Sequence, residues 1–438
     1  MSELTMFTYV LIMVATIYCG VHVYTRWINH VTIYGVVWGI QLVLFQMRLI
    51  KYPDFSMETT VFVFGAWAIF ILASLTITNF YSLRRVPSQE SRIGSSNLLA
   101  SALVGLTVIG AIGTLQHWMV LIKVFGGVKN AIISGNLIYS MSKREGGIPG
   151  MWPYIDSVSL SADFFGGVFA GLRKRPFVLG IFPFVVELAN AVSGFGRSRL
   201  IIGAILWGTA FFFPRARKAL ADRKTLAKRA LTVSFIVFIL VFGMQSVLTL
   251  RGGRESFTGE TTALSHIKGA GFITPSIYMY LSCDIPVLNK FLSYQFSGNV
   301  EHTPPGGYTF APFYRFISKF GIVDPMPVYD KFYNVPVGTN TGSYLRELYI
   351  DWGIGGSLLI VYLLGAICST VYETYQRKKS LAVFSLLAHL YVVVFFTFAV
   401  MATAWTYWLI SLVFSVLVGL IIDKFTKMVP HARVTDTF

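Results

Sequence analysis

Long apolar runs recur from one end of the chain to the other, and they restrict its fold more than any other feature. The chain has 438 residues, of which 55% are hydrophobic and only 13% are charged, and its mean hydropathy is +0.64. Soluble domains carry about a quarter charged residues, whereas a run of about 20 apolar residues is long enough to cross a bilayer as a helix. The sequence therefore predicts an all-α, polytopic membrane protein.

Eleven transmembrane helices are predicted, and the chain 1–438 is expected to form a single membrane domain. The predicted spans are 4–23, 31–47, 57–80, 97–122, 153–171, 177–193, 199–213, 230–250, 343–372, 381–400 and 404–422. The first run lacks a preceding basic segment and an A-x-A cleavage site. We therefore expect it to be a retained helix and not a removed signal peptide.

The basic loops predict the orientation of the chain in the membrane. Arg215–Arg229 holds seven basic residues and one acid, which is typical of a cytoplasmic loop. Three other basic loops, at 82–92, 172–176 and 376–379, fall on the same side by parity. This places the N-terminus outside, the C-terminus inside and the large segment 251–342 outside. Merging or splitting one early span would reverse the orientation.

The distribution of charge indicates an anionic ligand on the outer side. The net charge is +16, and 16 of the 36 Lys and Arg residues fall outside on the predicted topology, more than positive-inside bias alone produces. Nucleic acid is not an expected partner, because cytoplasmic loops account for the other basic residues. The three cysteines form no disulfide framework and have no metal-ligand spacing.

The outer segments contain predicted helices of their own. Gly126–Gly147 has apolar residues at helical spacing between pairs of glycines. Pro312–Phe320 (PFYRFISKF) begins with proline and is followed by Gly321, which are start and stop signals of a helix. Its aromatic face predicts an interfacial amphipathic helix that covers or grips a lipid, and Arg315 is placed to contact a lipid phosphate.

Two turns rich in arginine and glycine are predicted at the outer ends of spans. Gly194–Arg199 (GFGRSR) contains Arg197 and Arg199 with no neighbouring acid, and the eighth span ends in RGGR with Arg251 and Arg254. Guanidinium groups bind phosphate oxygens through charge-assisted hydrogen bonds worth about 1.5–3 kcal/mol each. Arginines at span ends also snorkel to lipid headgroups, but two such pairs favour a shared pyrophosphate site.

The segment Asn340–Gly356 (NTGSYLRELYIDWGIGG) predicts a polar stripe at the entry to the ninth span. Read at helical spacing, four polar residues share one face: Asn340, Tyr344, Glu347 and Asp351. That face would continue as Ile354 and Leu358. A polar stripe entering a membrane helix usually faces a cavity or a partner, although an ordinary interfacial helix start has the same pattern.

Acids and histidines on the outer side supply the candidate catalytic groups. Glu347 and Asp351 are the preferred candidates for a general base, because a helix would hold them at the membrane boundary. His302 is a third candidate, although a loop histidine is usually only solvated. Three further acids lie in or near spans, where pairing with arginines is their simplest role: Asp156, Asp163 and Glu187.

Together these motifs resemble a known family. A Gly196–Ser198 turn in mid-chain, a large external loop, and a late span entered through Asn340, Tyr344 and Asp351–Gly353 are similar to the Wzy-type O-antigen and oligosaccharide repeat-unit polymerases. The resemblance covers roughly Leu98–Leu420. It implies the multi-helical architecture that is shared with O-antigen ligases and C-type glycosyltransferases, in the bacterial inner membrane with the active site facing the periplasm.

The resemblance also implies a reaction. The enzyme would be a metal-independent glycosyltransferase without a cofactor, moving a growing glycan from undecaprenyl pyrophosphate to an incoming lipid-linked repeat unit. Four arginines, Arg197, Arg199, Arg251 and Arg254, would hold the pyrophosphates. Glu347 or Asp351 would act as base or orient the acceptor, and Asn340 and Tyr344 would bind sugar. A chain-length regulator is a further expected partner.

Two other functions remain open from the sequence. An O-antigen ligase would use the same donor but transfer the glycan to lipid A–core. A transporter or flippase of lipid-linked oligosaccharide belongs to a different class and is typically marked by charges through mid-membrane and by an internal repeat. No repeat is evident here, and the charges cluster at the outer face.

Overall fold

The computed structural model describes residues 2–50, 52–83, 96–142, 148–172, 178–194, 196–213, 275–297, 303–324, 331–335 and 338–428. Ten helices make up the bundle within these ranges: α1 (Ser2–Tyr24), α2 (His30–Gln46), α3 (Met57–Leu83), α4 (Ser96–Phe125), α7 (Val158–Leu172), α8 (Val178–Gly194), α9 (Ser198–Phe212), α15 (Tyr344–Lys378), α16 (Leu381–Phe396) and α17 (Thr406–Met428).

These helices correspond to ten of the eleven predicted spans. Six of the candidate spans are long and apolar enough to cross a membrane, and α2, α8, α9 and α16 are shorter apolar helices. The predicted span 230–250 lies outside the described residues. The prediction of an all-α membrane protein is thus confirmed, whereas the number of eleven spans stays a prediction.

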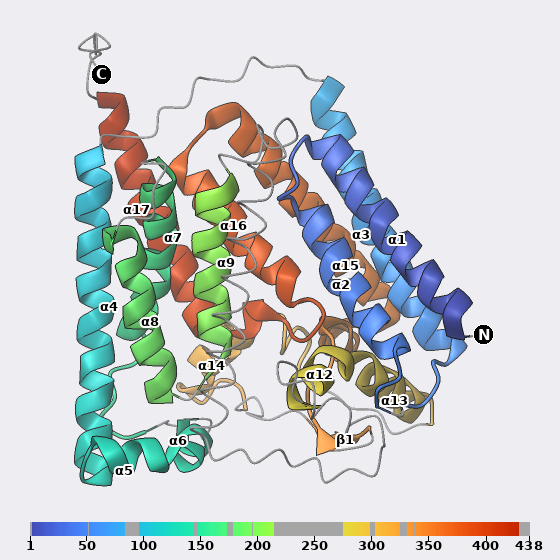
Figure 1. The fold of residues 1–438 in the computed structure, drawn as a ribbon, viewed down its shortest axis with the longest axis horizontal. Coiled ribbons are helices and arrows are strands. Elements are labelled where there is room, and N and C mark those ends of the chain that lie inside the picture. The colour runs from blue at the N-terminus through green and yellow to red at the C-terminus, as the bar shows by residue number, and fades with distance from the viewer. Residues whose placement is uncertain are drawn as a thin grey trace.

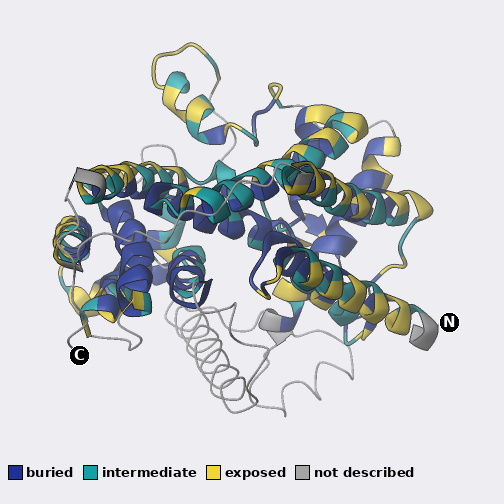
Figure 2. Ribbon diagram, turned by 90° about the horizontal axis from the view of Figure 1, so that it is seen from above, coloured by how far each residue is buried: buried dark blue, intermediate teal, exposed yellow. Residues whose placement is uncertain are grey.

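The bundle has two groups of helices, which Figure 1 shows at its two sides. Helices α1, α2, α3 and α15 pack together, and α4, α7, α8, α9 and α17 form the second group. Helix α16 contacts α2 and α15 as well as α9 and α17, and so joins the groups. Exposed residues lie mainly on the outward faces of peripheral helices in Figure 2, while the inner helices are buried.

Small residues allow α7 to occupy the centre of the second group. Every residue from Val158 to Ala170 is buried. A Cβ atom added at Gly166 would lie 2.5 Å from the Gly180 carbonyl oxygen, and one at Gly167 would lie 2.3 Å from the Trp207 carbonyl oxygen. Such close backbone approach is how helices associate in a membrane, where there is no hydrophobic drive between them.

A layer of short elements, which we name the outer layer, covers the end of the bundle at which the chain begins. It comprises α5 (Val128–Ile133), α6 (Gly135–Ser142), η1 (Ile155–Ser157), α12 (Pro275–Ser282), α13 (Asp284–Phe296), α14 (Ala311–Ser318), η3 (Ala402–Ala404) and an antiparallel pair of short strands, β1 (Tyr333–Asn334) and β2 (Gly338–Thr339). The C-terminus lies at the opposite end (Figure 1). Helices α5, α6 and α14 confirm the helices predicted in the outer segments.

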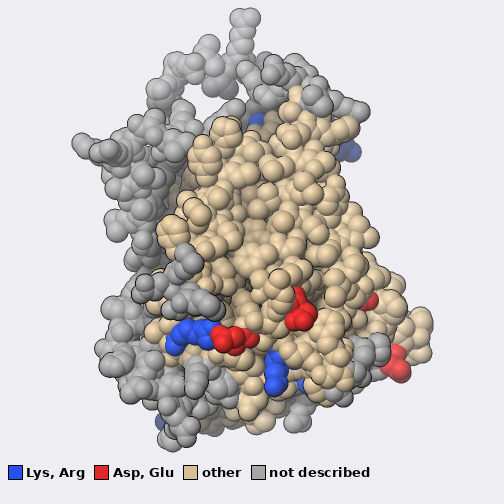
Figure 3. Space-filling model, turned by 90° about the vertical axis from the view of Figure 1, so that its right-hand side faces the viewer, with Lys and Arg blue, Asp and Glu red and all other residues tan. Residues whose placement is uncertain are grey.

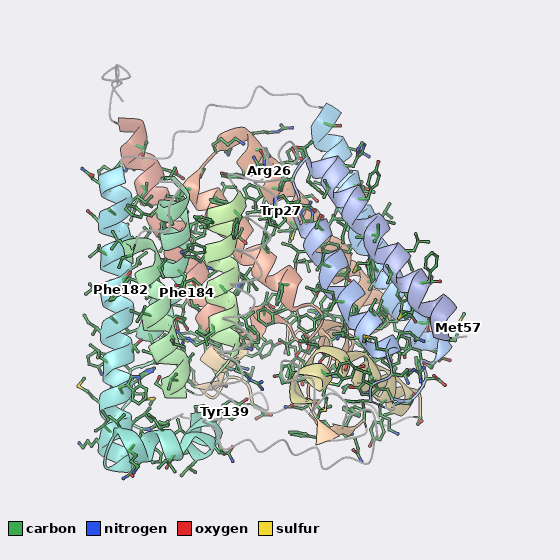
Figure 4. All side chains as sticks on the ribbon, viewed as in Figure 1. Arg26, Trp27, Met57, Tyr139, Phe182 and Phe184 are labelled. Atoms are coloured by element: carbon green, nitrogen blue, oxygen red, sulfur yellow. The ribbon has the colours of Figure 1, made fainter. Side chains whose placement is uncertain are left out.

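The charged side chains lie near these two ends of the bundle. Figure 3 shows a broad surface without charged side chains among the residues it colours, with Lys or Arg above it and both basic and acidic side chains below it. Arg26 and Trp27, labelled in Figure 4, lie at the end opposite the outer layer. Arg26 is buried there, donates to the carbonyl of Phe213 after α9, and has its guanidinium 4.5 Å from the Phe213 ring centroid. A cation at a helix C-terminus is favourable.

Candidate functional site

The polar stripe at the start of α15 differs from its prediction in two ways. The helix begins at Tyr344, so Asn340 lies before it and not on its face. Gly353 has φ 64° and ψ −173°, which interrupts the helix. Glycine tolerates such a positive φ. Tyr344, Glu347 and Asp351 keep the predicted spacing, but the face they share does not continue regularly beyond the interruption.

Asp351 holds the turn that precedes α14. Its Oδ1 accepts hydrogen bonds from the Thr303 hydroxyl (3.1 Å) and the Tyr308 N–H (3.0 Å). Its Oδ2 accepts from the N–H and the hydroxyl of Thr309, both at 2.7 Å. Four accepted bonds fill the lone-pair sites of a carboxylate. Asp351 is therefore arranged to position the 303–309 segment.

Glu347 holds a second segment in the same way. Its Oε2 accepts a hydrogen bond of 2.5 Å from the N–H of Met401, in the turn between α16 and η3. The Tyr344 N–H bonds to the Thr397 carbonyl oxygen at 3.1 Å, which ties the first residue of α15 to the end of α16. The two predicted acids thus fix the two segments that flank the start of α15.

An apolar cavity of about 380 Å³ lies between these segments, and we name it the outer groove. It is lined by the 309–313 segment, α15, the end of α16 with the turn after it, and the start of α17. The lining residues are Thr309, Phe310, Pro312, Phe313, Tyr344, Leu348, Ile360, Leu363, Leu364, Ile367, Val393, Thr397, Val400, Met401, Thr403, Trp408 and Leu409. None of them carries a charge, and the volume is within the range of small-molecule pockets.

Helix α14 covers the outer end of this groove. Phe313 lines the groove yet keeps 60% of its surface exposed, and Phe316 is equally exposed on the same helix. Arg315 is exposed and donates to the Ala404 carbonyl oxygen at 3.1 Å, next to the groove residue Thr403. The predicted amphipathic helix therefore lies at the groove mouth and brings one arginine to it.

The arginine turn before α9 has acidic neighbours that its own sequence does not contain. Arg199 forms an ion pair with Asp156 before α7, and its Nε donates to Oε1 of Glu187 on α8 at 2.8 Å. Asn190 donates to Asp156 at 3.1 Å, and the Ser159 hydroxyl donates to Glu187. No acid lies beside this turn in the sequence, but η1 and α8 bring two acids to Arg199 in the structure. The pairing predicted for Asp156 and Glu187 is confirmed.

Arg197 faces an aromatic side chain and not an acid. Its guanidinium lies 4.8 Å from the ring centroid of Tyr280 on α12. The adjacent Ser198 hydroxyl bonds to the Tyr407 hydroxyl at 2.9 Å, one residue from the groove residue Trp408. Neither Arg197 nor Arg315 forms an ion pair with any residue that the structure describes. These two arginines keep a charge available to an anion.

The remaining predicted site residues are dispersed. Arg251, Arg254 and His302 lie outside the described residues. The Tyr344 ring lines the groove, but its hydroxyl is buried against the Tyr34 hydroxyl at 3.1 Å. Asn340 is half-buried, and its carbonyl oxygen accepts from Arg346 at 3.1 Å. The structure thus places the two predicted sugar-binding residues in different surroundings.

Pairing with an arginine is predicted for Asp163 as well, but this acid forms no ion pair with any residue that the structure describes. It is fully buried on α7, and neither carboxylate oxygen has a hydrogen-bond partner among the residues that the structure describes. A Cβ atom added at Gly203 of α9 would lie 2.3 Å from Asp163 Oδ2. The sequence shows only that an acid lies within an apolar run, and this does not predict which residue it contacts.

Comparisons of the chain with protein-family models, characterised proteins and solved structures find no match. The class of protein therefore follows from the fold alone. It is a multi-helical membrane protein with an apolar groove at one end of its bundle.

Proposed function

We propose that the protein polymerises oligosaccharide repeat units carried on undecaprenyl pyrophosphate, as the resemblance to Wzy-type polymerases implies. The outer groove is the observation that carries this proposal. Its apolar walls suit a prenyl chain, and Arg315 lies at its mouth beside the outer layer. A lipid-linked sugar presents an apolar chain, a pyrophosphate and a sugar in that order. The groove, the arginine and the outer layer offer matching surroundings in the same order.

In the proposed reaction a hydroxyl oxygen of the incoming unit attacks the anomeric carbon of the growing glycan. The bond between that carbon and the pyrophosphate oxygen breaks, and undecaprenyl pyrophosphate leaves with the electron pair. The hydroxyl proton passes to a base. Guanidinium groups stabilise the charge that develops on the leaving group, and Arg315 and Arg197 are available for this role.

The other residues receive supporting roles in the proposal. Glu347 and Asp351 hold the segments that form the groove walls, which favours orientation of the substrate over proton transfer. Arg199 ties α9 to η1 and α8 and so positions Arg197. Arg251, Arg254 and His302 remain sequence predictions for the same site, and Asn340 remains a predicted sugar-binding residue.

A purified-protein assay tests the proposal. The protein is reconstituted in vesicles with a synthetic undecaprenyl-pyrophosphate repeat unit, and the products are separated by size. A ladder of lengthened glycans supports the polymerase. Transfer only to added lipid A–core identifies a ligase, and movement of the lipid across the bilayer without a new glycosidic bond identifies a transporter. Either of these two results overturns the proposal.

Matched variants test the groove within that assay. Leu364→Trp would fill the groove and is expected to raise the KM for the lipid-linked donor. Leu359→Trp, which changes a lipid-facing residue of the same helix that is 58% exposed, is the control.

Arg315→Ala should lower kcat/KM about 10- to 100-fold, the equivalent of one charge-assisted hydrogen bond. Lys319→Ala, on the same segment, is the control. If a variant and its control changed the kinetics equally, the role assigned to that residue would be contradicted.

A further inference from the structure

A second polar cluster lies in the outer layer, apart from the outer groove. Asp284 begins α13 and is fully buried. Its Oδ2 accepts a hydrogen bond of 3.0 Å from Nε2 of Gln41 on α2, which is also buried. Neither Oδ1 of Asp284 nor Oε1 of Gln41 has a hydrogen-bond partner in the described part of the chain. The pair thus contains two buried acceptors with no donor in hydrogen-bonding geometry among the described residues, although the Thr341 hydroxyl is close enough to favour the charged form of Asp284.

One proton would satisfy both acceptors. A carboxylate offers only acceptors, but a carboxylic acid gains one O–H donor. When the amide N–H that lies on the same side as the amide oxygen donates to one carboxyl oxygen, the amide oxygen faces the other carboxyl oxygen. A proton on Oδ1 can therefore be donated to Oε1, and the two groups form a ring of two hydrogen bonds. Leaving both acceptors buried and unsatisfied is costly by comparison.

We propose that Asp284 is a proton-binding residue that locks the outer layer to the bundle as an acid–amide pair with Gln41. On losing the proton, the Asp284 carboxylate exchanges Gln41 for the guanidinium of Arg346, a buried residue of α15 close enough to interact with it electrostatically. The residue therefore has two arrangements, one neutral and one ionic.

The acid–amide pair is connected to the wall of the outer groove. Gln41 Nε2 also donates to the Phe398 carbonyl oxygen at 3.3 Å, and the Trp38 indole N–H donates to the Thr397 hydroxyl at 3.0 Å. Both acceptors belong to the turn after α16, whose neighbouring residues line the groove. Once Asp284 no longer holds the amide, Gln41 can rotate, which weakens its bond to Phe398 in this turn. The proton on Asp284 thus stabilises the groove wall.

The surroundings of Asp284 support a proton at neutral pH. Burial raises the pKa of Asp284 to about 8, against the opposing effects of the Thr341 hydroxyl, the Arg346 guanidinium and the Gln41 amide. Burial also raises the pKa values of its other titratable neighbours, which therefore stay neutral: Cys283 on the same turn, Tyr280 on α12, and Tyr52 between α2 and α3. Asp284 is thus the member of this cluster whose charge changes near pH 8.

The sign of the pH dependence follows from this pKa. An unfolded aspartate titrates near about 3.9, so between roughly pH 4 and pH 8 the folded protein binds one more proton than the unfolded chain. The stabilising contribution is fully present below the lower pKa and is lost as the pH rises through the upper one. Each pH unit in this window changes the unfolding equilibrium constant about tenfold toward the unfolded state.

The test uses the full-length protein in nanodiscs and the variant Asp284→Asn, whose amide can pair with Gln41 at any pH. Difference infrared spectroscopy between pH 6 and pH 9 is expected to show the carbonyl stretch of a protonated carboxylic acid disappearing in the wild type with a midpoint near 8. The variant should lack this band. Asp324→Asn, which alters an exposed outer acid, should retain it. A wild-type spectrum without the band at pH 6 would overturn the proposal.

Hydrogen exchange provides the second readout and does not depend on the proposed function, since no lipid substrate is used. Exchange in residues 397–401, compared between wild type and Asp284→Asn at each pH, should become faster in the wild type above pH 8. Gln41→Leu should speed that exchange at every pH, and it covers the case in which the aspartate variant folds poorly. Equal exchange in all three proteins would refute the connection to the groove.

Discussion

Replacing Asp351 by asparagine separates two roles for this carboxylate, a general base and the support of the 303–309 segment. The amide oxygen of the substituted side chain can keep the two bonds from Thr309, because it can take the place of Oδ2. The amide nitrogen then takes the place of Oδ1 and faces the Tyr308 N–H, donor against donor. The Thr303 hydroxyl can rotate and accept, so one backbone N–H loses its acceptor.

The expected destabilisation follows from these changes. A partly buried donor such as the Tyr308 N–H costs about 1–3 kcal/mol when it loses its acceptor, and the loss of charge weakens the surviving bonds by about 1 kcal/mol. We therefore expect Asp351→Asn to lower the free energy of unfolding by about 2–4 kcal/mol. The 303–309 segment leads directly into the groove residues Phe310 and Phe313, so the KM for the lipid-linked donor should rise as well.

The assay combines thermal unfolding in detergent, limited proteolysis of the 303–309 segment and steady-state kinetics. Asp324→Asn is the control, because it removes an exposed carboxylate of the outer layer. A lower thermal midpoint and faster cleavage are expected for Asp351→Asn alone. Loss of a general base would instead lower kcat by about 10²–10⁴-fold without a change in stability. An unchanged thermal midpoint together with lost turnover would refute the supporting role.

Three further predictions concern stability. Gly203→Ala should destabilise the protein by about 1–3 kcal/mol through its clash with Asp163, whereas Gly208→Ala on the same helix meets no neighbour and should be silent in thermal unfolding. Arg199→Met should cost about 3–5 kcal/mol, because it leaves two buried carboxylates unpaired; unaltered stability would contradict this. The free energy of unfolding should fall by about 1.4 kcal/mol per pH unit between pH 5 and pH 7, a slope that Asp284→Asn should abolish.

Local sequence patterns predicted the helices well. The apolar runs gave the ends of the ten bundle helices to within six residues, because the length and composition of a span are local properties. The signals around α14 were also sufficient, since Pro312 is in its first turn and Gly321 has φ +69° just beyond its end. The stripe at α15 was only partly predicted, because helical spacing does not reveal an interruption such as Gly353.

The candidate site was less predictable, because its contacts join residues far apart in the chain. Arg199 has no acid beside it in the sequence, but its acidic partners come from η1 and α8, more than ten residues away. Asp351 looked available as a base, but backbone N–H groups from the 303–309 segment occupy it. No pattern within one segment could have shown these partners.

The sequence by itself determined that this is a helical membrane protein. Burial of apolar side chains and internal pairing of the backbone are local requirements in a bilayer. Only the tertiary structure decided which charges are neutralised, which remain available to a ligand, and where the outer groove lies. The reason is physical: a charge or a cavity is defined by the groups that surround it, and here several helices and their connecting segments supply them.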